Sequence, residues 1–169
     1  MLPAVSFAVE VRTVYLNPAS GSDGNSGLTE SAAVQSVSAA YAALSGAEEG
    51  VICLVGTLTT TAQTDFPACD IPVTITGGKL SVGGHIFFGG DTTLENMTLT
   101  LTTGNNTTYL SSEGHDLTIG EGVTCSYTTS HRLCLTGRYG AGSSDGVTLT
   151  VKSGVWHNIM IAGYKSDTT

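Results

Sequence analysis

Charge, and positive charge above all, is scarce in this 169-residue sequence. Only 12% of the residues are charged, and 6 Lys and Arg stand against 14 Asp and Glu, which gives a formal net charge of −8. Nucleic acids and anionic membranes are bound through basic patches. Because the few cations are scattered along the chain, the sequence argues against nucleic acid as a partner and predicts an acidic, solvated surface.

Long apolar runs are missing as well. No segment approaches the roughly 20 consecutive apolar residues that cross a bilayer, so we expect no membrane insertion. Residues 1–9 are apolar, but they lack a basic start and are interrupted by Pro3, which makes them a poor secretory signal. Two interpretations stay open: a signal has been removed, or the sequence is part of a larger chain.

The four cysteines lack the spacing of a metal site. No CxxC pair occurs, and the histidines lie far from the cysteines in sequence, so we predict no zinc site. Cys53 and Cys134 stand inside apolar segments, where a thiol is usually a small buried side chain. Two alternatives remain: reduced thiols throughout, or one or two disulfides that would pair Cys53 with Cys69 and Cys125 with Cys134.

What the sequence does contain is a repeat of six residues. Residues 73–90 read VTITGG, KLSVGG and HIFFGG, and the next blocks, DTTLEN and MTLTLT, keep the spacing. Paired glycines supply the positive φ angles and the missing side chains that a sharp corner needs. A short, fixed period indicates a solenoid. Further on, LTIGEGVT and LTVKSGVW align with their glycine and valine in register, which predicts equivalent positions in successive coils.

The chain divides into two parts of a single domain, residues 1–49 and residues 50–169. The first part begins with an alternating strand at residues 11–16, and a loop dense in turn-forming residues follows it. From residue 50 on only strand signals remain, apart from an irregular excursion at residues 126–146.

A helix should complete the first part. Thr29 is expected to cap it and Ser45-Gly46 to end it. Apolar residues recur at helical spacing on one face, namely Val34, Val37, Tyr41 and Leu44. We expect this face to cover the first coil of the solenoid, because an open first coil would expose its core and its strand edges.

The opening TVYLNPASGSDGNSGLTESAAVQSVSAAYAAL resembles the N-terminal signature of pectate-lyase-like right-handed parallel β-helix proteins, and the match covers Val14 to Leu44. The remainder, with its Gly-Gly corners, is similar to non-catalytic β-helix segments of large cell-surface proteins of gut Firmicutes. The resemblance implies an all-β fold, a right-handed parallel β-helix (solenoid) over residues 50–163 with an N-terminal capping α-helix. It also implies an extracellular or bacterial cell-surface location.

In such a fold, apolar side chains point inward and stack coil on coil, while the threonines point outward. The expected inward residues are Val73, Ile75, Leu94, Leu99, Leu117, Ile119, Leu149 and Val151. The last coil, roughly residues 147–163, presents unpaired strand edges. We expect it to be covered by further polypeptide or downstream domains, or by end-to-end association with a second subunit.

The catalytic pattern of the family does not carry over. Its lyases use Ca²⁺ held by clustered acids with an Arg or Lys base, and the related hydrolases use paired carboxylates. The acids here stand singly at the ends of strands: Asp91, Glu95, Glu113, Asp116 and Glu121. We therefore assign no catalytic residue and expect no sugar release from pectin, alginate or glycosaminoglycans.

Two groups of residues are candidates for binding. Aromatic and cationic side chains that could stack on sugars or line a groove stand in the excursion: Tyr127, His131, Arg132, Arg138 and Tyr139. Their structural alternative is a set of solvated loop side chains. The oxygen-rich loop of Asn17, Asp23 and Asn25 is a candidate Ca²⁺ site, against the alternative of Asx-turn hydrogen bonds. No other cofactor is expected.

These observations support three hypotheses about function. The first is a non-catalytic, adhesin-like extracellular module that presents a glycan- or protein-binding surface. The second is a truncated polysaccharide lyase or glycoside hydrolase domain. The third is a self-stacking structural or filament subunit.

Overall fold

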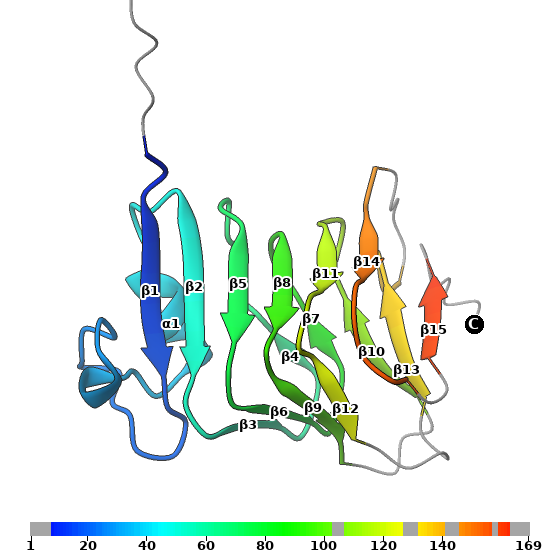
Figure 1. The fold of residues 1–169 in the computed structure, drawn as a ribbon, viewed down its shortest axis with the longest axis horizontal. Helices are drawn as coiled ribbons and strands as arrows, with labels where there is room; N and C mark the ends of the chain where they lie inside the picture. The colour runs from blue at the N-terminus through cyan, green and yellow to red at the C-terminus, as the bar shows by residue number, and fades with distance from the viewer. Residues whose placement is uncertain (1–7, 103–106, 127–131, 141–145, 157–158, 163–169) are drawn as a thin grey trace, which may run out of the picture.

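The computed structural model describes residues 8–102, 107–126, 132–140, 146–156 and 159–162. These residues form an all-β, solenoid-like fold of stacked parallel sheets, with a single α-helix at one end (Figure 1). Every strand pairing among them is parallel. No helix in this part of the chain is long and apolar enough to span a membrane.

The strands fall into three sheets, named here A, B and C. Sheet A consists, in order, of β1 (Val11–Leu16), β2 (Glu49–Leu54), β5 (Val73–Thr76), β8 (Thr92–Glu95), β11 (Leu117–Ile119) and β14 (Leu149–Val151). Sheet B consists of β3 (Thr57–Thr60), β6 (Lys79–Val82), β9 (Thr98–Leu101) and β12 (Thr124–Ser126). Sheet C consists of β4 (Thr64–Asp65), β7 (Ile86–Phe87), β10 (Thr107–Ser111), β13 (Arg132–Thr136) and β15 (Ile159–Ala162).

The six-residue blocks are the sides of one coil. VTITGG, KLSVGG and HIFFGG contain β5, β6 and β7, which belong to sheets A, B and C in turn. The following block, DTTLEN, returns to sheet A, where Val73 pairs with Thr92. The second repeat is also confirmed, because Leu117 pairs with Leu149 and Ile119 with Val151.

The glycines at the corners serve two different purposes. Between β5 and β6, Gly77 and Gly78 adopt φ angles of 78° and 54°, which side chains disfavour. At the other corners the glycines make room for the neighbouring coil. A Cβ on Gly84 would collide with the backbone of Ala62, and one on Gly90 with the carbonyl oxygen of Cys69. Both reasons expected from the sequence therefore operate, and they coincide at Gly78, where a Cβ would also lie 2.6 Å from the carbonyl oxygens of Leu54 and Gly56.

The helix is shorter than the sequence suggested. A 3-10 turn, η1 (Glu30–Ala32), comes first, and α1 (Val37–Ala43) follows with Ser36 as its N-cap, while the Thr29 side chain makes no capping bond. The expected cap at Thr29 was wrong because the intervening segment bonds to β1. The Val34 N–H donates to the Tyr15 carbonyl (3.0 Å), and the Val34 carbonyl accepts from Asn17 (2.8 Å). These bonds hold Val34 in an extended bridge to Leu16.

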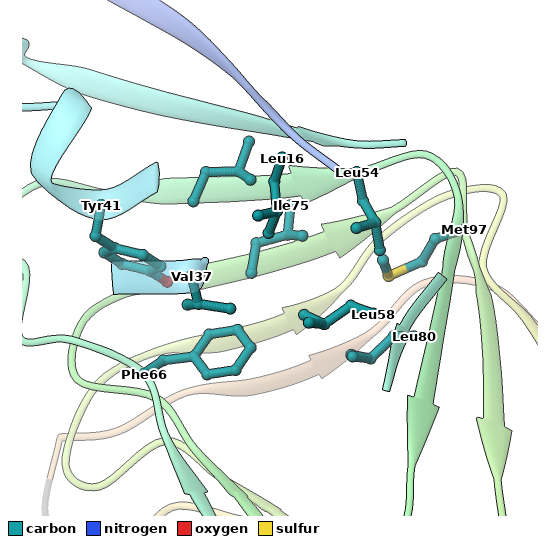
Figure 2. A pocket seen from close by; sticks show the side chains of 10 residues that line it. Leu16, Val37, Tyr41, Leu54, Leu58, Phe66, Ile75, Leu80 and Met97 are labelled. Atoms are coloured by element: carbon teal, nitrogen blue, oxygen red, sulfur yellow. The ribbon is translucent and has the colours of Figure 1, made fainter. Parts of the chain in front are cut away.

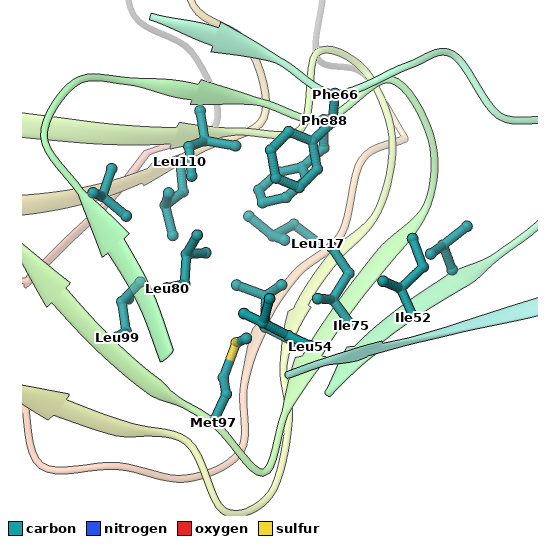
Figure 3. Packing of buried hydrophobic residues seen from close by; sticks show 14 of the residues in the cluster. Ile52, Leu54, Phe66, Ile75, Leu80, Phe88, Met97, Leu99, Leu110 and Leu117 are labelled. Carbon is teal, nitrogen blue, oxygen red and sulfur yellow. The ribbon is translucent and has the colours of Figure 1, made fainter. Parts of the chain in front are cut away.

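The core is a continuous apolar column. Of the residues expected to point inward, six are at most 4% exposed: Val73, Ile75, Leu94, Leu99, Leu117 and Ile119. Aromatic rings continue the column from the helix, with Tyr41 edge-on to Phe66 at 6.2 Å and Phe66 edge-on to Phe88 at 5.2 Å. Figure 3 shows Phe66 and Phe88 beside the stacked leucines and isoleucines.

The helix closes the first coil as expected. Val34 and Leu44 are at most 2% exposed, and Val37 and Tyr41 point from α1 into the interior (Figure 2). The cavity left beneath α1 measures only about 10 Å³, and it is lined by apolar side chains. A space of this size holds one water at most, so this cavity is a packing defect of the core and not a binding site.

The expectation that threonines point outward holds only in part. Thr74, Thr93 and Thr118 are half-buried on the outer side of sheet A. Thr92 and Thr108 instead point into the core and are at most 4% exposed. The Thr92 hydroxyl donates to the Gly90 carbonyl (2.9 Å), so this inward position satisfies its polar group.

The last coil is the least buried. Leu149 and Val151 are only half-buried, although they occupy the positions of Leu117 and Ile119. Val155 is 78%, Met160 47% and Ile161 56% exposed. The expectation that further polypeptide or a second subunit covers this end stays a prediction.

Candidate functional site

An aromatic cluster lies on the outer face of sheet C. Ile86 and Leu110 point into the core, so their neighbours His85, Phe87 and Tyr109 point outward. Tyr139, which follows β13, packs onto all three rings. Its ring centroid lies 5.5 Å from that of His85, 5.2 Å from that of Phe87 and 4.8 Å from that of Tyr109. We call these four residues the aromatic cluster.

Glu113 anchors the segment that carries Tyr139. The Ser111 hydroxyl donates to Oε1 of Glu113 (2.5 Å), and the backbone N–H of Tyr139 donates to the same oxygen (3.1 Å). The Thr136 hydroxyl donates to the Arg138 carbonyl (2.7 Å). Ser111 and Thr136 are fully buried although both point away from the core. Residues 137–140, which follow β13, therefore form a packed layer over sheet C.

A groove of about 340 Å³ borders the aromatic cluster. One ring of the cluster, Phe87, lines it together with the polar side chains of Gln63, Asp65 and Glu113. Gly89 adds a stretch of wall without a side chain, because the preceding coil approaches within 2.8 Å of the place where its Cβ would be. Gln63 Nε2 donates to Oδ1 of Asp65 (3.2 Å).

This arrangement suits a ligand that has both apolar faces and hydroxyl groups. An aromatic ring offers a flat apolar surface. The carboxylates accept hydrogen bonds and the Gln63 amide can both donate and accept them. A pyranose ring combines the complementary groups, with C–H bonds on its faces and hydroxyls around its edge.

The structure brings some of the sequence-predicted binding residues to this face. Tyr139 belongs to the aromatic cluster, and Arg138 lies beside it in the covering layer, with Nη1 3.5 Å from a Cβ built on Gly114. Arg132 is exposed at the start of β13, where it pairs with Thr107. Tyr127 and His131 lie outside the described residues.

Sequence reasoning missed three residues of this face: His85, Phe87 and Glu113. Two of them, His85 and Phe87, could have been predicted from the sequence HIFFGG. If Ile86 and Phe88 face the core, strand alternation turns His85 and Phe87 outward, where a pair of rings is unusual. Glu113 belongs to this face because it accepts a hydrogen bond from Tyr139, and no pattern in the sequence around Glu113 predicts that contact.

The candidate Ca²⁺ loop uses its side chains to hold the backbone. Asn17 Oδ1 accepts from the N–H groups of Ala19 and Ser20, each at 3.1 Å. Asn25 Nδ2 donates to the Ala33 carbonyl (2.9 Å). The two bonds to Asn17 are the Asx-turn hydrogen bonds of the structural alternative, and the Asn25 bond ties the loop to the segment before the helix. Among the described residues, no group of three or more His, Cys, Asp or Glu side chains could hold a metal ion.

Asp23 joins the same loop to the start of the helix. Its Oδ1 accepts from the backbone N–H groups of Ser36 (2.7 Å) and Gln35 (2.8 Å). Hydrogen bonds from the side chain and backbone of Ser36, and then from Gln35, hold the pKa of Asp23 below its ordinary value. The charged carboxylate is therefore the form that fixes this loop to the helix N-terminus.

All four cysteines are free thiols in the structure, as in the reduced alternative: Cys53, Cys69, Cys125 and Cys134. Burial raises the pKa of Cys125 to about 12 and also raises the pKa of Cys53. Because the thiolate is the reactive form, these two thiols are poor nucleophiles at neutral pH.

Two of the acids singled out in the sequence have a structural use at the corner between sheets C and A. Oδ1 of Asp91 accepts from the backbone N–H of Asp116 (2.9 Å), and Oδ1 of Asp116 accepts from that of Thr148 (2.7 Å). His115 approaches Asp91 at 3.8 Å. Each aspartate thus ties its own coil to the next, which accounts for these carboxylates without catalysis.

Comparisons with protein-family models, with curated proteins and with solved structures find no match to this chain.

Proposed function

We propose that this chain is a non-catalytic, extracellular module of the bacterial cell surface that binds a glycan on the outer face of sheet C. The proposal includes a right-handed parallel β-helix of the pectate-lyase-like type. The opening motif, the three parallel sheets and the strong right-handed preference of parallel crossovers support it.

One observation carries the proposal: Phe87 and the two carboxylates of Asp65 and Glu113 line one groove. On the outer side of sheet A, by contrast, the corresponding positions hold Thr74, Thr93 and Thr118. Phe87 is half-buried on this outer face, so part of its ring is left to contact a ligand. A protein ligand is the competing occupant, but the combination of the Phe87 ring with the polar side chains of Asp65 and Glu113 suits a sugar ring and its hydroxyls.

Isothermal titration calorimetry with a panel of oligosaccharides tests the proposal. The panel contains cello-, xylo-, galacto- and chito-oligosaccharides and oligogalacturonates. We expect saturable binding to at least one of them, and Phe87→Ala should weaken it about tenfold or more, because the stacking surface is lost.

Tyr15→Ala is the matched control, since Tyr15 is a half-buried aromatic on the outer side of sheet A. It should leave the affinity unchanged. Absence of binding across the whole panel would contradict the proposal, and so would an equal loss in both variants.

A second candidate function, glycoside hydrolysis, is favoured by the same two carboxylates. Hydrolases cleave between paired acids, one protonating the leaving oxygen and the other acting as base or nucleophile. We expect the protein to release no reducing sugar from the bound oligosaccharides. Release that disappears in both Asp65→Asn and Glu113→Gln would establish the hydrolase instead.

A further inference from the structure

We propose that the groove selects sugars without carboxyl groups, namely neutral or amino sugars, and excludes uronates, and that Asp65 and Glu113 determine this selectivity. The inference rests on the proposed glycan-binding function and names its substrate class. It starts from the fact that the ionisable groups lining the groove are both acids.

Both the backbone and the side chain of Glu113 are constrained by their surroundings. Its φ angle is 51°, a left-handed conformation that is unfavourable for a residue with a side chain. Two hydrogen bonds, from Ser111 and Tyr139, end on its Oε1. Strained residues that are fixed by their surroundings occur preferentially at functional sites. The hydrogen bonds among the described residues use Oε1 alone, which leaves Oε2 available as an acceptor.

Asp65 contributes the second carboxylate from the neighbouring coil. It is exposed at the end of β4 and pairs in register with Phe87. Gln63 contacts Asp65 through its amide and therefore leaves the negative charge in place. Phe87 thus has an acidic residue on the side of each neighbouring strand. On β4 its register partner is Asp65 itself. On β10 its register partner is Ser111, whose hydroxyl donates to Glu113.

Arg138 brings a positive charge to the neighbourhood of Glu113. Its guanidinium lies beside Gly114, the residue after Glu113, and it does not line the groove. The chain as a whole carries a net charge of −8, so the long-range field also disfavours anions.

The carboxylates of Asp65 and Glu113 are expected to discriminate between sugars according to the charge of the sugar. A neutral pyranose donates its hydroxyls to the two carboxylates, and charged acceptors make the stronger kind of hydrogen bond. A protonated amino sugar adds an attraction. A uronate brings a third carboxylate into a groove that two carboxylates already line, and at separations of several ångströms the summed repulsion amounts to roughly tenfold in affinity.

The experiment compares two ligands that differ by their carboxyl groups: neutral galacto-oligosaccharide and oligogalacturonate of equal length. The neutral ligand should bind at least about tenfold more tightly at low ionic strength, and added salt should narrow the difference by screening. Asp65→Asn with Glu113→Gln should reduce the preference to about threefold or less. Gln keeps the Oε1 acceptor for Ser111 and Tyr139, so only the charge is removed.

Glu95→Gln with Glu121→Gln is the matched control, because it removes the same net charge away from the groove. This pair should keep the full preference. Oligogalacturonate binding as tightly as the neutral ligand would overturn the inference and leave the proposed function intact. A preference that survives in Asp65→Asn with Glu113→Gln would also overturn it. Binding of neither ligand, nor of any other oligosaccharide, would remove the proposed function and this inference together.

Discussion

The outer faces of sheets A and C are built on the same backbone but carry different chemistry. On sheet A a single register position repeats across all six strands as Thr13, Val51, Thr74, Thr93, Thr118 and Thr150. Every one of these side chains is β-branched, as suits a pleated surface beside water. On sheet C the two outward positions of the neighbouring strands hold His85 and Phe87, then Tyr109 and Ser111, then Cys134 and Thr136.

The difference between the two faces shows which side-chain positions can depart from the solenoid repeat. On both sheets the inward positions must fill the same core, so most of them are aliphatic, with Thr92 on sheet A and Thr108 on sheet C as exceptions. The outward positions are free to vary. On sheet A one outward position keeps β-branched residues, while the other varies and holds Tyr15, Cys53, Thr76 and Glu95. On sheet C they support a second packed layer, in which Tyr139 covers rings and Glu113 joins two segments. We therefore assign the proposed binding function to the irregular face, that of sheet C.

The largest contrast is expected in thiol protection. Cys53 is half-buried on the outer side of sheet A, whereas Cys134, on the outer side of sheet C, is only 2% exposed. A maleimide should modify Cys53 at least about a hundredfold faster, because Cys134 becomes accessible only through local opening that costs about 3 kcal/mol or more. Peptide mass spectrometry over a time course gives both rates. Equal rates would mean that the layer over sheet C is not packed.

Removing Tyr139 should destabilise the protein more than a change on sheet A. Tyr139→Ala deletes three ring contacts and should lower the free energy of unfolding by about 2 kcal/mol. Thr93→Ala should change it by about 0.5 kcal/mol or less. Urea denaturation measures both variants. A Tyr139 variant as stable as the Thr93 variant would show that the ring rests on the surface without stabilising it.

Glu113 allows backbone strain to be separated from hydrogen bonding. Glu113→Ala loses the bonds to Ser111 and Tyr139 and should cost about 1–2 kcal/mol of unfolding free energy. Glu113→Gly loses the same bonds but adopts a φ of 51° without strain. The Gly variant should therefore be more stable than the Ala variant by about 0.5–1 kcal/mol. The reverse order in denaturant titrations would rule out strain at this position.

The smallest effect is expected from a region outside both faces. The folded-state pKa of Asp23 is depressed, so its contribution to stability is present above the unfolded pKa and is lost as the pH falls through the folded pKa. Asp23→Asn keeps an acceptor for Ser36 but has no charge to lose. Its unfolding free energy should vary less between about pH 2 and 5 than that of the unmodified protein. Identical pH profiles would contradict this role of Asp23.

Much of the fold follows from local patterns, and much of the site does not. The strand at Val11–Leu16, the inward aliphatic residues and the equivalence of Leu117 with Leu149 were predictable from alternation and repetition. The helix start was not, because the bridge between Val34 and Leu16 overrides a sequence that is compatible with helix. In the site, Arg138 and Tyr139 were predicted as binding candidates, while Phe87 and Glu113 were overlooked.

By itself, the sequence determined how the chain coils. Corners and strand alternation are properties of a few neighbouring residues, and Gly77-Gly78 with the VTIT, KLSV and HIFF strands specifies them directly. Only the tertiary structure decided which outward side chains meet. Phe87, Glu113 and Tyr139 come from different coils, and their contact depends on the register that coil lengths and hydrogen bonding between strands impose. No local preference encodes that register, because each residue's partner lies a full coil away.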